Sequence, residues 1–346
     1  MKPISEQRPN FVQFDNLDAW LDSFRTRVGA SEVAAILGHG YADHNEFTTW
    51  ESKVNPTERD TDEPEPMHFL IGKELEPALR RLFEKITGIG CNTPPDNSVV
   101  YDPDRPWLGA SLDGWGFDES RNFPIELKNV HPRMSRDWDD NAIPLKYAIQ
   151  VQIQMHCCGS DVGFLFGLCG TDTTFVREIP RNQPFIDAAL IKLDEFWRMV
   201  EEETPPSVDH SQSTANALAR LYPQDDGTGI ALPDGSTQWA EALELAKAQI
   251  KGWEQVKREA SNRIKNCIGD HAYGVFDDGS GYSWKAQTRV LKPRLEETTS
   301  TVRVLRAVKR TPKAMTVQPS FGVLPFEPVA LPGENENGKP ESTDDD

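Results

Sequence analysis

The chain has 346 residues, of which 37% are hydrophobic, and a formal net charge of −18 at pH 7. This length predicts one main domain with an appendage. Its apolar runs fall short of the roughly 20 residues that a membrane helix needs, so we expect no membrane span. The five cysteines, two of them adjacent, favour a reduced cytoplasmic protein. The polar first ten residues predict no signal peptide.

The first third of the chain predicts mostly helices. Asn16 is expected to cap a helix over 17–24, and Ser31 a second one over 32–37. The charged, proline-bearing segment 54–66 indicates a loop. Apolar residues at helical spacing then predict a long helix over 67–87. The expected stripe of that helix consists of Ile71, Leu75, Ala78, Leu82 and Ile86.

Extended segments alternate with helices in the middle of the chain. Strands are predicted over 98–101, 107–117 and 124–130, with 118–122 as a hairpin turn. A helix over 145–157, strands over 162–168 and 174–179 and a helix over 183–202 follow. This order predicts a mixed central sheet flanked by helices, which is an α/β sandwich over residues 1–205.

The remaining chain predicts smaller elements. Residues 206–236 are expected to form a linker. The region 237–310 is expected to hold an amphipathic helix over 237–268, a β-hairpin over 273–285 and a strand over 301–308. The apolar stripe of this helix is compatible with coiled-coil-like packing, although packing on a core is the commoner explanation. Residues 311–346 predict an acidic, disordered tail.

One short constellation indicates chemistry. Alternation along the strand 124–130 places Glu126 and Lys128 on one face, and Asp113 at the end of the preceding strand is expected to reach the same point. Hard oxygen ligands of this kind hold Mg²⁺, which activates water for attack on a phosphodiester. A lysine beside the metal stabilises negative charge in the transition state. Taken alone, so short a motif is more often a solvated strand face.

Two helices add residues to this site. Glu76 lies on the long helix, where Gly72 is expected to permit close approach of a neighbour and Glu76 to overhang the metal. Tyr147, Gln150 and Gln154 recur at helical spacing on the helix 145–157. Such glutamines are commonly just solvated, but beside a metal site they would bind the water or the scissile phosphate.

Five segments resemble the YqaJ-like viral recombinases and the exonuclease of phage lambda, which belong to the PD-(D/E)XK nucleases. The matching segments are RTRVGASEVAAILG at 25–38, GKELEP at 72–77, SLDG at 111–114, ELK at 126–128 and IPLKYAIQVQIQM at 143–155. The usual proline before the aspartate is Leu112 here. Motifs in the family's order are far more specific than any single match.

The resemblance implies a fold, an activity and residue roles. It implies a PD-(D/E)XK core that digests duplex DNA from its ends, 5′ to 3′, with Mg²⁺ or Mn²⁺, in the cytoplasm of a bacterial host. It also implies a single-strand annealing partner and a ring-like homotrimer. The implied roles are metal ligation by Asp113, Glu126 and auxiliary Glu76, catalysis by Lys128 and Gln150, DNA contact by Tyr147, and a 5′-phosphate pocket of Arg25 or Arg27, Ser31 and Ser111.

Two other functions stay open at this point. The first is a PD-(D/E)XK endonuclease with the same metal site, which closed circular DNA would distinguish from an exonuclease. The second is a non-catalytic DNA-end-binding or assembly module, which the net charge of −18 and the long helix over 237–268 suggest. The acidic tail carries part of that charge, and the intact Asp113, Glu126 and Lys128 set favours catalysis.

Overall fold

The computed structural model describes residues 8–41, 43–56, 67–117, 122–286 and 317–318. The chain divides into two compact units, Met1–Pro223 and Gln224–Asp346. Among the described helices, none combines the length and apolar character that crossing a membrane requires. The expected turn at 118–121, the expected strand at 301–308 and most of the expected tail lie outside the described residues.

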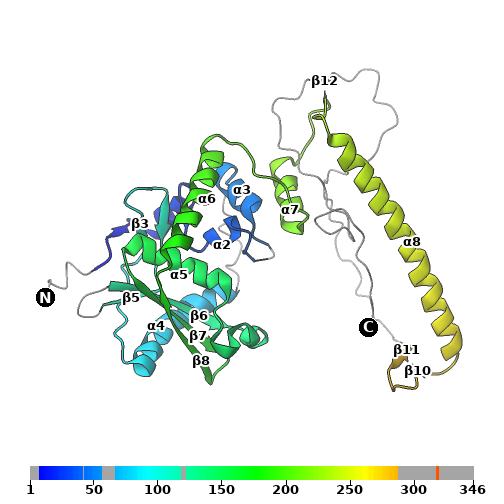
Figure 1. The fold of residues 1–346 in the computed structure, drawn as a ribbon, viewed down its shortest axis with the longest axis horizontal. Helices are drawn as coiled ribbons and strands as arrows, with labels where there is room; N and C mark the ends of the chain where they lie inside the picture. The colour runs from blue at the N-terminus through cyan, green and yellow to red at the C-terminus, as the bar shows by residue number, and fades with distance from the viewer. Residues whose placement is uncertain (1–7, 42, 57–66, 118–121, 287–316, 319–346) are drawn as a thin grey trace, which may run out of the picture. The chain divides into compact units, whose positions relative to one another are not determined.

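The centre of the first unit is a mixed four-stranded sheet in the order β5-β6-β7-β8. Its strands are β5 (Gly114–Phe117), β6 (Asn122–Val130), β7 (Val162–Cys169) and β8 (Thr173–Pro180). The β6 and β7 strands are parallel because α5 (Leu145–Cys158) connects them, and the outer pairs are antiparallel. Helix α4 (Met67–Thr87) covers one face and α5 the other (Figure 1). The expected α/β fold with a mixed sheet between helices is confirmed.

Helix α4 has the expected bounds but a different buried face. Leu79 and Phe83 are buried against the sheet, whereas Ile71 and Ile86 are exposed. The expected stripe is therefore wrong in part, because the larger Leu79 and Phe83 side chains take the core positions. Gly72 has open space where a Cβ would lie, so the close approach expected there is absent from the described contacts.

A second four-stranded sheet has the order β1-β3-β4-β2. Its strands are β1 (Phe11–Gln13), β2 (Val28–Gly29), β3 (Ser98–Tyr101) and β4 (Leu108–Ala110). The single strand expected over 107–117 is wrong: β4 belongs to this sheet and β5 to the other. The chain crosses between the sheets at residues 111–113. Helix α5 contacts strands of both sheets, so it is the central helix of the unit.

The short helices near the N-terminus follow the sequence closely. Asn16 caps α1 (Leu17–Asp22) as expected, and the 3-10 segment η2 (Ser23–Arg25) continues it. The next helix, α2 (Val33–Ile36), has Glu32 at its N-cap position and no side-chain cap, so the capping role expected for Ser31 is wrong. Glu32 instead accepts a hydrogen bond from the Gly29 N–H at 2.7 Å.

Three further helices complete the first unit: α3 (Glu46–Val54), α6 (Gln183–Glu201) and α7 (Gln212–Leu221). The sequence indicated α6 but neither α3 nor α7, which lies inside the range expected to be a linker. Asn45 caps α3 and donates hydrogen bonds to Asp209 and to Ser211, the cap of α7. This shared polar network joins the starts of the two helices.

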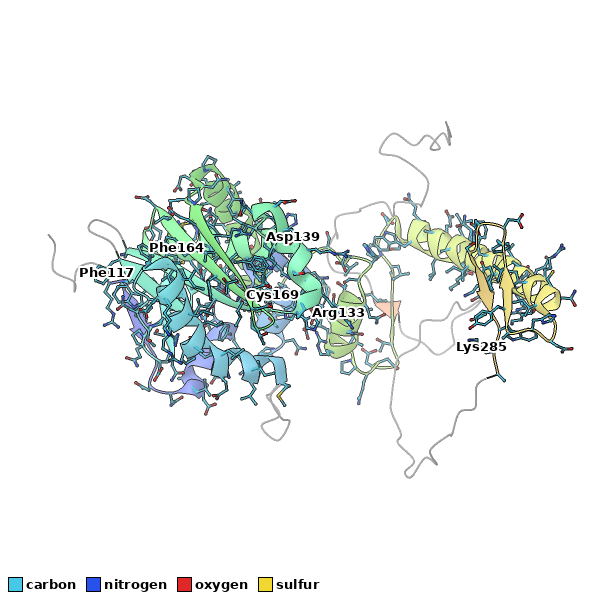
Figure 2. All side chains as sticks on the ribbon, turned by 90° about the horizontal axis from the view of Figure 1, so that it is seen from below. Phe117, Arg133, Asp139, Phe164, Cys169 and Lys285 are labelled. Carbon is cyan, nitrogen blue, oxygen red and sulfur yellow. The ribbon has the colours of Figure 1, made fainter. Side chains whose placement is uncertain are left out.

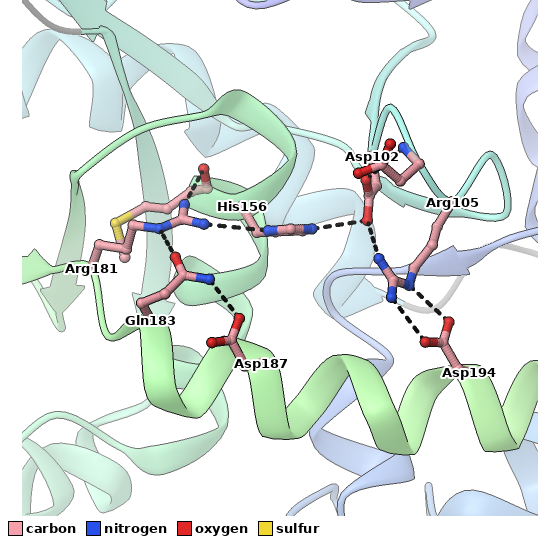
Figure 3. A network of polar contacts seen from close by, with 9 residues as sticks. Asp102, Arg105, His156, Arg181, Gln183, Asp187 and Asp194 are labelled. Carbon is pink, nitrogen blue, oxygen red and sulfur yellow. Dashed lines mark hydrogen bonds and ion pairs between the residues drawn. The ribbon is translucent and has the colours of Figure 1, made fainter.

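A polar network also anchors the C-terminal end of α5 (Figure 3). His156 lies 2.8 Å from the Asp102 carboxylate, and its Nδ1 accepts a hydrogen bond from Arg181. Arg181 can only donate, so the ring is the neutral tautomer that donates from Nε2 to Asp102. Burial opposes ionisation of Asp102, but hydrogen bonds from the Asp104 N–H and His156 keep its pKa below the usual value. The network fixes α5 between β3 and the start of α6.

The second unit has the expected long helix and hairpin. Helix α8 (Ser236–Ile268) is followed by β10 (Tyr273–Val275) and β11 (Gly281–Ser283), which pair antiparallel. Strand β12 (Val317–Gln318), within the expected tail, pairs with β9 (Gly229–Ile230). In this unit, the α8 stripe leaves Ile250, Trp253 and Val256 exposed.

Candidate active site

The crossing between the two sheets places Asp113. Its carboxylate Oδ2 accepts a hydrogen bond from the Leu127 N–H at 2.8 Å, directly beyond the Gly114–Ile125 pair where β5 begins. The side chain thus accepts a backbone hydrogen bond at the end of the β5–β6 ladder. The interruption of the strand, which the sequence did not reveal, is what brings this carboxylate to β6.

Strand β6 presents alternate faces as predicted. Ile125 and Leu127 pack towards α4 in one apolar cluster. Glu126 and Lys128 point to the opposite face, where their side chains form an ion pair. Gln150 Nε2 donates to Glu126 Oε1 at 2.7 Å, and Gln154 Nε2 donates to Glu126 Oε2 at 2.5 Å. Glu126 is fully buried, and its carboxylate interacts with the two glutamine amides and the Lys128 ammonium.

Glu76 lies on α4, near enough to Glu126 and Lys128 for their charges to act on its carboxyl group. Arg80, one turn further along, donates from Nη1 both to Glu76 and to the Asp113 carbonyl oxygen, the latter at 2.7 Å. Arg80 therefore joins α4 to the crossing segment, a role that sequence reasoning missed. The Glu76–Arg80 spacing of four residues on a helix was the signal available for this pair.

The electrostatics of the site favour a bound cation. Burial, followed by the charge of Glu126, raises the pKa of Asp113 to about 8. Burial also raises the pKa of Glu76, and Glu126 adds to this while Arg80 opposes it. Burial opposes the charge of Lys128, but Glu126 and Asp113 raise its pKa. Among the described residues, the charges of Lys128 and Arg80 oppose this rise in the pKa of the carboxyl groups.

The residues present fit a divalent metal ion in their donor chemistry. No trio of His, Cys, Asp or Glu side chains converges as a ready-made metal site in the described parts of the chain. Asp113 and Glu126 nevertheless supply the hard oxygens that Mg²⁺ prefers. Two buried polar atoms, Ser111 Oγ and Gln154 Oε1, have no partner within the described structure. Such atoms require a partner such as water or a ligand.

The predicted phosphate-pocket residues fall into two groups. Arg25 is exposed on η2. Arg27 is 1% exposed, its Nη2 has no partner among the described residues, and burial lowers its pKa. Its Nη1 and Ser31 Oγ both lie within 4 Å of the point where a Gly29 Cβ would stand. The geometry groups Arg27, rather than Arg25, with Ser31.

Tyr147 lies beside Lys128, and the segment that follows β6 packs against Tyr147. The Tyr147 ring lies 5.3 Å from Lys128 Nζ, and its hydroxyl lies 3.1 Å from that of Tyr41, a residue that sequence reasoning missed. The 3-10 segment η3 (Pro132–Asn141) packs Trp138 in a cluster with Cys169 and carries Arg133 outward (Figure 2).

Residues 19–161 match the family model of the YqaJ-like viral recombinase domain. Over these residues the chain is similar to the YqaJ-like viral recombinases. The chain is also similar to the uncharacterized protein YqaJ of Bacillus subtilis (strain 168), with 24% identity over 75% of this chain and 80% of the relative. Every predicted site residue lies inside the matched residues 19–161.

The solved structures that are similar to this chain include two exonucleases. One is an alkaline exonuclease (LHK-Exo) from Laribacter hongkongensis, with 19% identity and a TM-score of 0.44 over 59% of this chain and 100% of that one. The other is a phage-related exonuclease from Haemophilus somnus 129PT, with 16% identity and a TM-score of 0.38 over 51% of this chain and 94% of that one. The match ends at residue 161, directly before β7. It therefore includes β5 and β6 of the central sheet and β2, β3 and β4 of the second sheet, but not β1, β7 or β8.

Proposed function

We propose that the protein is a Mg²⁺-dependent exonuclease that digests double-stranded DNA from its ends in the 5′-to-3′ direction, with Mn²⁺ as a substitute. The observation that carries the proposal is the meeting of Asp113, Glu126 and Lys128 at one point beside β6. The match of residues 19–161 to the YqaJ-like viral recombinase domain supports it. Phosphodiester hydrolysis needs this combination of carboxylates and a cation.

Each residue has a distinct role in the proposed reaction. Asp113 and Glu126 would hold the metal, with Glu76 as an auxiliary acid; when bound, the metal activates water and neutralises charge on the phosphate. Lys128 stabilises negative charge that develops on the phosphoryl oxygens. Gln150 and Gln154 orient the Glu126 carboxylate through their amide hydrogens. Arg80 positions Glu76 against the crossing segment.

The preference for ends is assigned to Arg27 with Ser31 and Ser111. Lys53 and Arg27 are both buried near Glu32, and Lys53 Nζ is hydrogen-bonded to Glu32 at 2.7 Å. The single carboxylate of Glu32 therefore balances the two buried cations Lys53 and Arg27, which leaves one positive charge in excess. In addition, Arg27 Nη2 has no hydrogen-bond partner among the described residues. A terminal phosphate supplies both charge and acceptors. Arg25 on the surface contributes general attraction for the DNA backbone.

The cellular role follows from the direction of digestion. Removal of the 5′ strand leaves single-stranded DNA, which a single-strand annealing protein can pair with a second strand in recombination. We assign the protein to this process in the cytoplasm of a bacterial host. A ring-like homotrimer would enclose the duplex and favour processive digestion, and sedimentation of the full chain tests that assembly.

The activity is tested on linear duplexes with 5′-phosphate or 5′-hydroxyl ends, with Mg²⁺ or with EDTA, beside a closed circular duplex. We expect metal-dependent loss of label from the 5′ end, faster on phosphorylated ends, and an intact circle. Cleavage of the circle would instead establish an endonuclease with the same metal site. Binding of ends without hydrolysis in any metal would establish a non-catalytic end-binding module.

A further inference from the structure

Two tyrosines and a lysine form a cluster beside Lys128: Tyr41, Tyr147 and Lys146. Lys146 Nζ lies 3.6 Å from the centroid of the Tyr41 ring and 5.1 Å from that of Tyr147. The two tyrosine hydroxyls are 3.1 Å apart, and the Tyr147 ring is 5.3 Å from Lys128 Nζ. Tyr41 is 53% exposed. The cluster therefore extends from Lys128, whose partner Glu126 is buried, to the exposed ring of Tyr41.

The backbone holds Tyr41 in this position. Tyr41 lies in the connection between α2 and α3, where the His44 N–H donates to the Tyr41 carbonyl oxygen at 2.9 Å. The preceding Gly40 is packed so closely against Ala35 and the His44 carbonyl that a Cβ would clash with both. Tyr41 is thus presented by a tight turn that only glycine permits at this point.

Lys146 carries a charge that faces aromatic rings rather than an acid. In the described parts of the chain, it forms no ion pair with a carboxylate. This is informative in a protein with a net charge of −18, where carboxylates outnumber lysines and arginines. Contact with a ring contributes only about 0.5–1 kcal/mol at an exposed site. The ammonium therefore remains available to an anion such as a phosphate.

We propose that Tyr41 and Lys146 bind the terminal nucleotide of the substrate as an unpaired nucleotide, an inference that rests on the proposed nuclease function. The exposed Tyr41 ring stacks on the unpaired base, and Lys146 contacts the phosphate that follows it. Tyr147 links this subsite to Lys128. Aromatic stacking on a base contributes about 1–3 kcal/mol, which corresponds to roughly 5- to 150-fold in affinity. The substrate end is then engaged with its base pair open.

The stacking is tested with a duplex whose 5′-terminal base is an unpaired 2-aminopurine, in Ca²⁺ to suppress cleavage. Wild-type protein is expected to quench the fluorescence, Tyr41→Phe to quench it equally, and Tyr41→Leu to lose the quenching with about 10-fold weaker binding. Tyr222→Leu, at an equally exposed tyrosine (54%), serves as the control. If Tyr41 acted only through its hydroxyl, Tyr41→Phe would fail as completely as Tyr41→Leu, and the stacking role would be rejected.

The phosphate contact is tested by the salt dependence of binding to the same DNA. Lys146→Gln is expected to reduce the slope of log K against log salt by about 0.7–0.9, the contribution of one phosphate contact. Lys192→Gln, on the exposed side of α6, should leave the slope unchanged. An unchanged slope in Lys146→Gln would mean that Lys146 only packs against the rings, which overturns this half of the proposal.

Hydrolysis with Mg²⁺ separates this inference from the proposed function. Wild-type hydrolysis with no effect of Tyr41→Leu on rate or quenching would reject the subsite and leave the nuclease intact. Quenching that depends on Tyr41, without hydrolysis by the wild type, would retain the subsite and reject the nuclease. A paired terminal base should be digested more slowly by Tyr41→Leu than an unpaired one, because opening it then lacks the stacking contact.

Discussion

The Asp113 carboxylate is hydrogen-bonded to the backbone N–H of Leu127, the residue between Glu126 and Lys128. One side chain therefore completes the β5–β6 ladder and contributes a carboxylate to the active site. Because these two tasks use different properties of the aspartate, substitution can separate them. An asparagine keeps an oxygen that accepts from Leu127 but loses the negative charge.

Asp113→Asn should retain the stability of the wild type and lose hydrolysis. Asp113→Ala should lose hydrolysis and also about 1–3 kcal/mol of stability, because the Leu127 N–H is left without its partner. Urea unfolding and a hydrolysis assay on the same samples measure both effects. Wild-type turnover in Asp113→Asn would show that the carboxylate charge is not needed.

Metal binding should strengthen as pH rises, because the pKa of Asp113 is raised to about 8. Between the unfolded value near 4 and pH 8, the metal-free folded protein keeps a proton that the unfolded chain has lost. The stability contributed by this proton is present at low pH and lost as pH rises to 8. A metal ion must displace the proton, so its affinity should increase up to 10-fold per pH unit below 8.

Calorimetry with Mn²⁺ at pH 6.5, 7.5 and 8.5 measures this dependence. About one proton should be released per metal at the lowest pH and fewer at the highest. Asp113→Asn should bind weakly with little dependence on pH. Equal affinity at all three pH values in the wild type would contradict the ligand role of Asp113.

The sequence predicted the parts of this site that follow from period and spacing. Alternation along a strand was enough to place Glu126 and Lys128 on one face, and helical spacing placed Gln150 and Gln154 together. It did not reveal the break at residues 111–113, because the side-chain hydrogen bond found there joins Asp113 to the distant Leu127. Tyr41 was missed because its partner Tyr147 lies far away in the sequence. The four-residue spacing of Arg80 from Glu76 was available, but the contact of Arg80 with the Asp113 carbonyl oxygen was not.

The fold was predictable to a similar degree. Strands β3, β6, β7 and β8 and helices α4, α5, α6 and α8 have clear periodicity and were predicted within a few residues. Helices α3 and α7 are short, and a joint network of Asn45 and Asp209 supports their starts. No local pattern reports that network. Likewise, helical spacing does not decide which side of α4 packs on the sheet. A stripe that includes Ile71 and Ile86 and one that includes Leu79 and Phe83 were both compatible with the sequence.

Lys128→Ala should reduce the rate of hydrolysis by about 10²–10³, the usual effect of removing one preorganised electrostatic group. Binding of duplex DNA in Ca²⁺ should change little. Lys192→Ala on α6, whose lysine pairs with Glu195, is the matched control and should hydrolyse at the wild-type rate. Hydrolysis by Lys128→Ala within a few-fold of wild type would exclude a catalytic lysine.

Arg27 rather than Arg25 should determine the preference for 5′-phosphorylated ends. Arg27→Lys keeps the buried charge but loses the planar set of N–H donors, so it should reduce the rate ratio between 5′-phosphate and 5′-hydroxyl duplexes. Arg25→Ala should keep that ratio and weaken binding by about one unit of salt slope. The opposite pattern in initial rates would move the pocket to Arg25.

Asn45→Ala should destabilise the first unit by about 1–2 kcal/mol, because it removes a helix cap and the hydrogen bonds to Asp209 and Ser211. Asp209→Ala should cost less, since that side chain is largely exposed. Burial opposes ionisation of Asp209, but hydrogen bonds from Ser211 and Thr214 hold its pKa at about 2.

The pH dependence identifies this contribution. Stability from Asp209 should be complete above about pH 4 and lost as pH falls to 2. Thermal unfolding of wild type and Asp209→Ala should therefore differ by a constant amount at neutral pH and converge in strong acid. A difference that persists at pH 2 would assign the effect to lost packing instead.

The two faces of β6 have a consequence for how this chain tolerates change in length. Insertion of one residue ahead of Glu126 would turn every following side chain to the opposite face. Leu127 would then point at the glutamines of α5, and two charges would lie against Phe83 in the apolar layer beneath α4. The register of β6 with respect to its neighbours thus governs catalysis and folding together, and a one-residue insertion in this strand should abolish both.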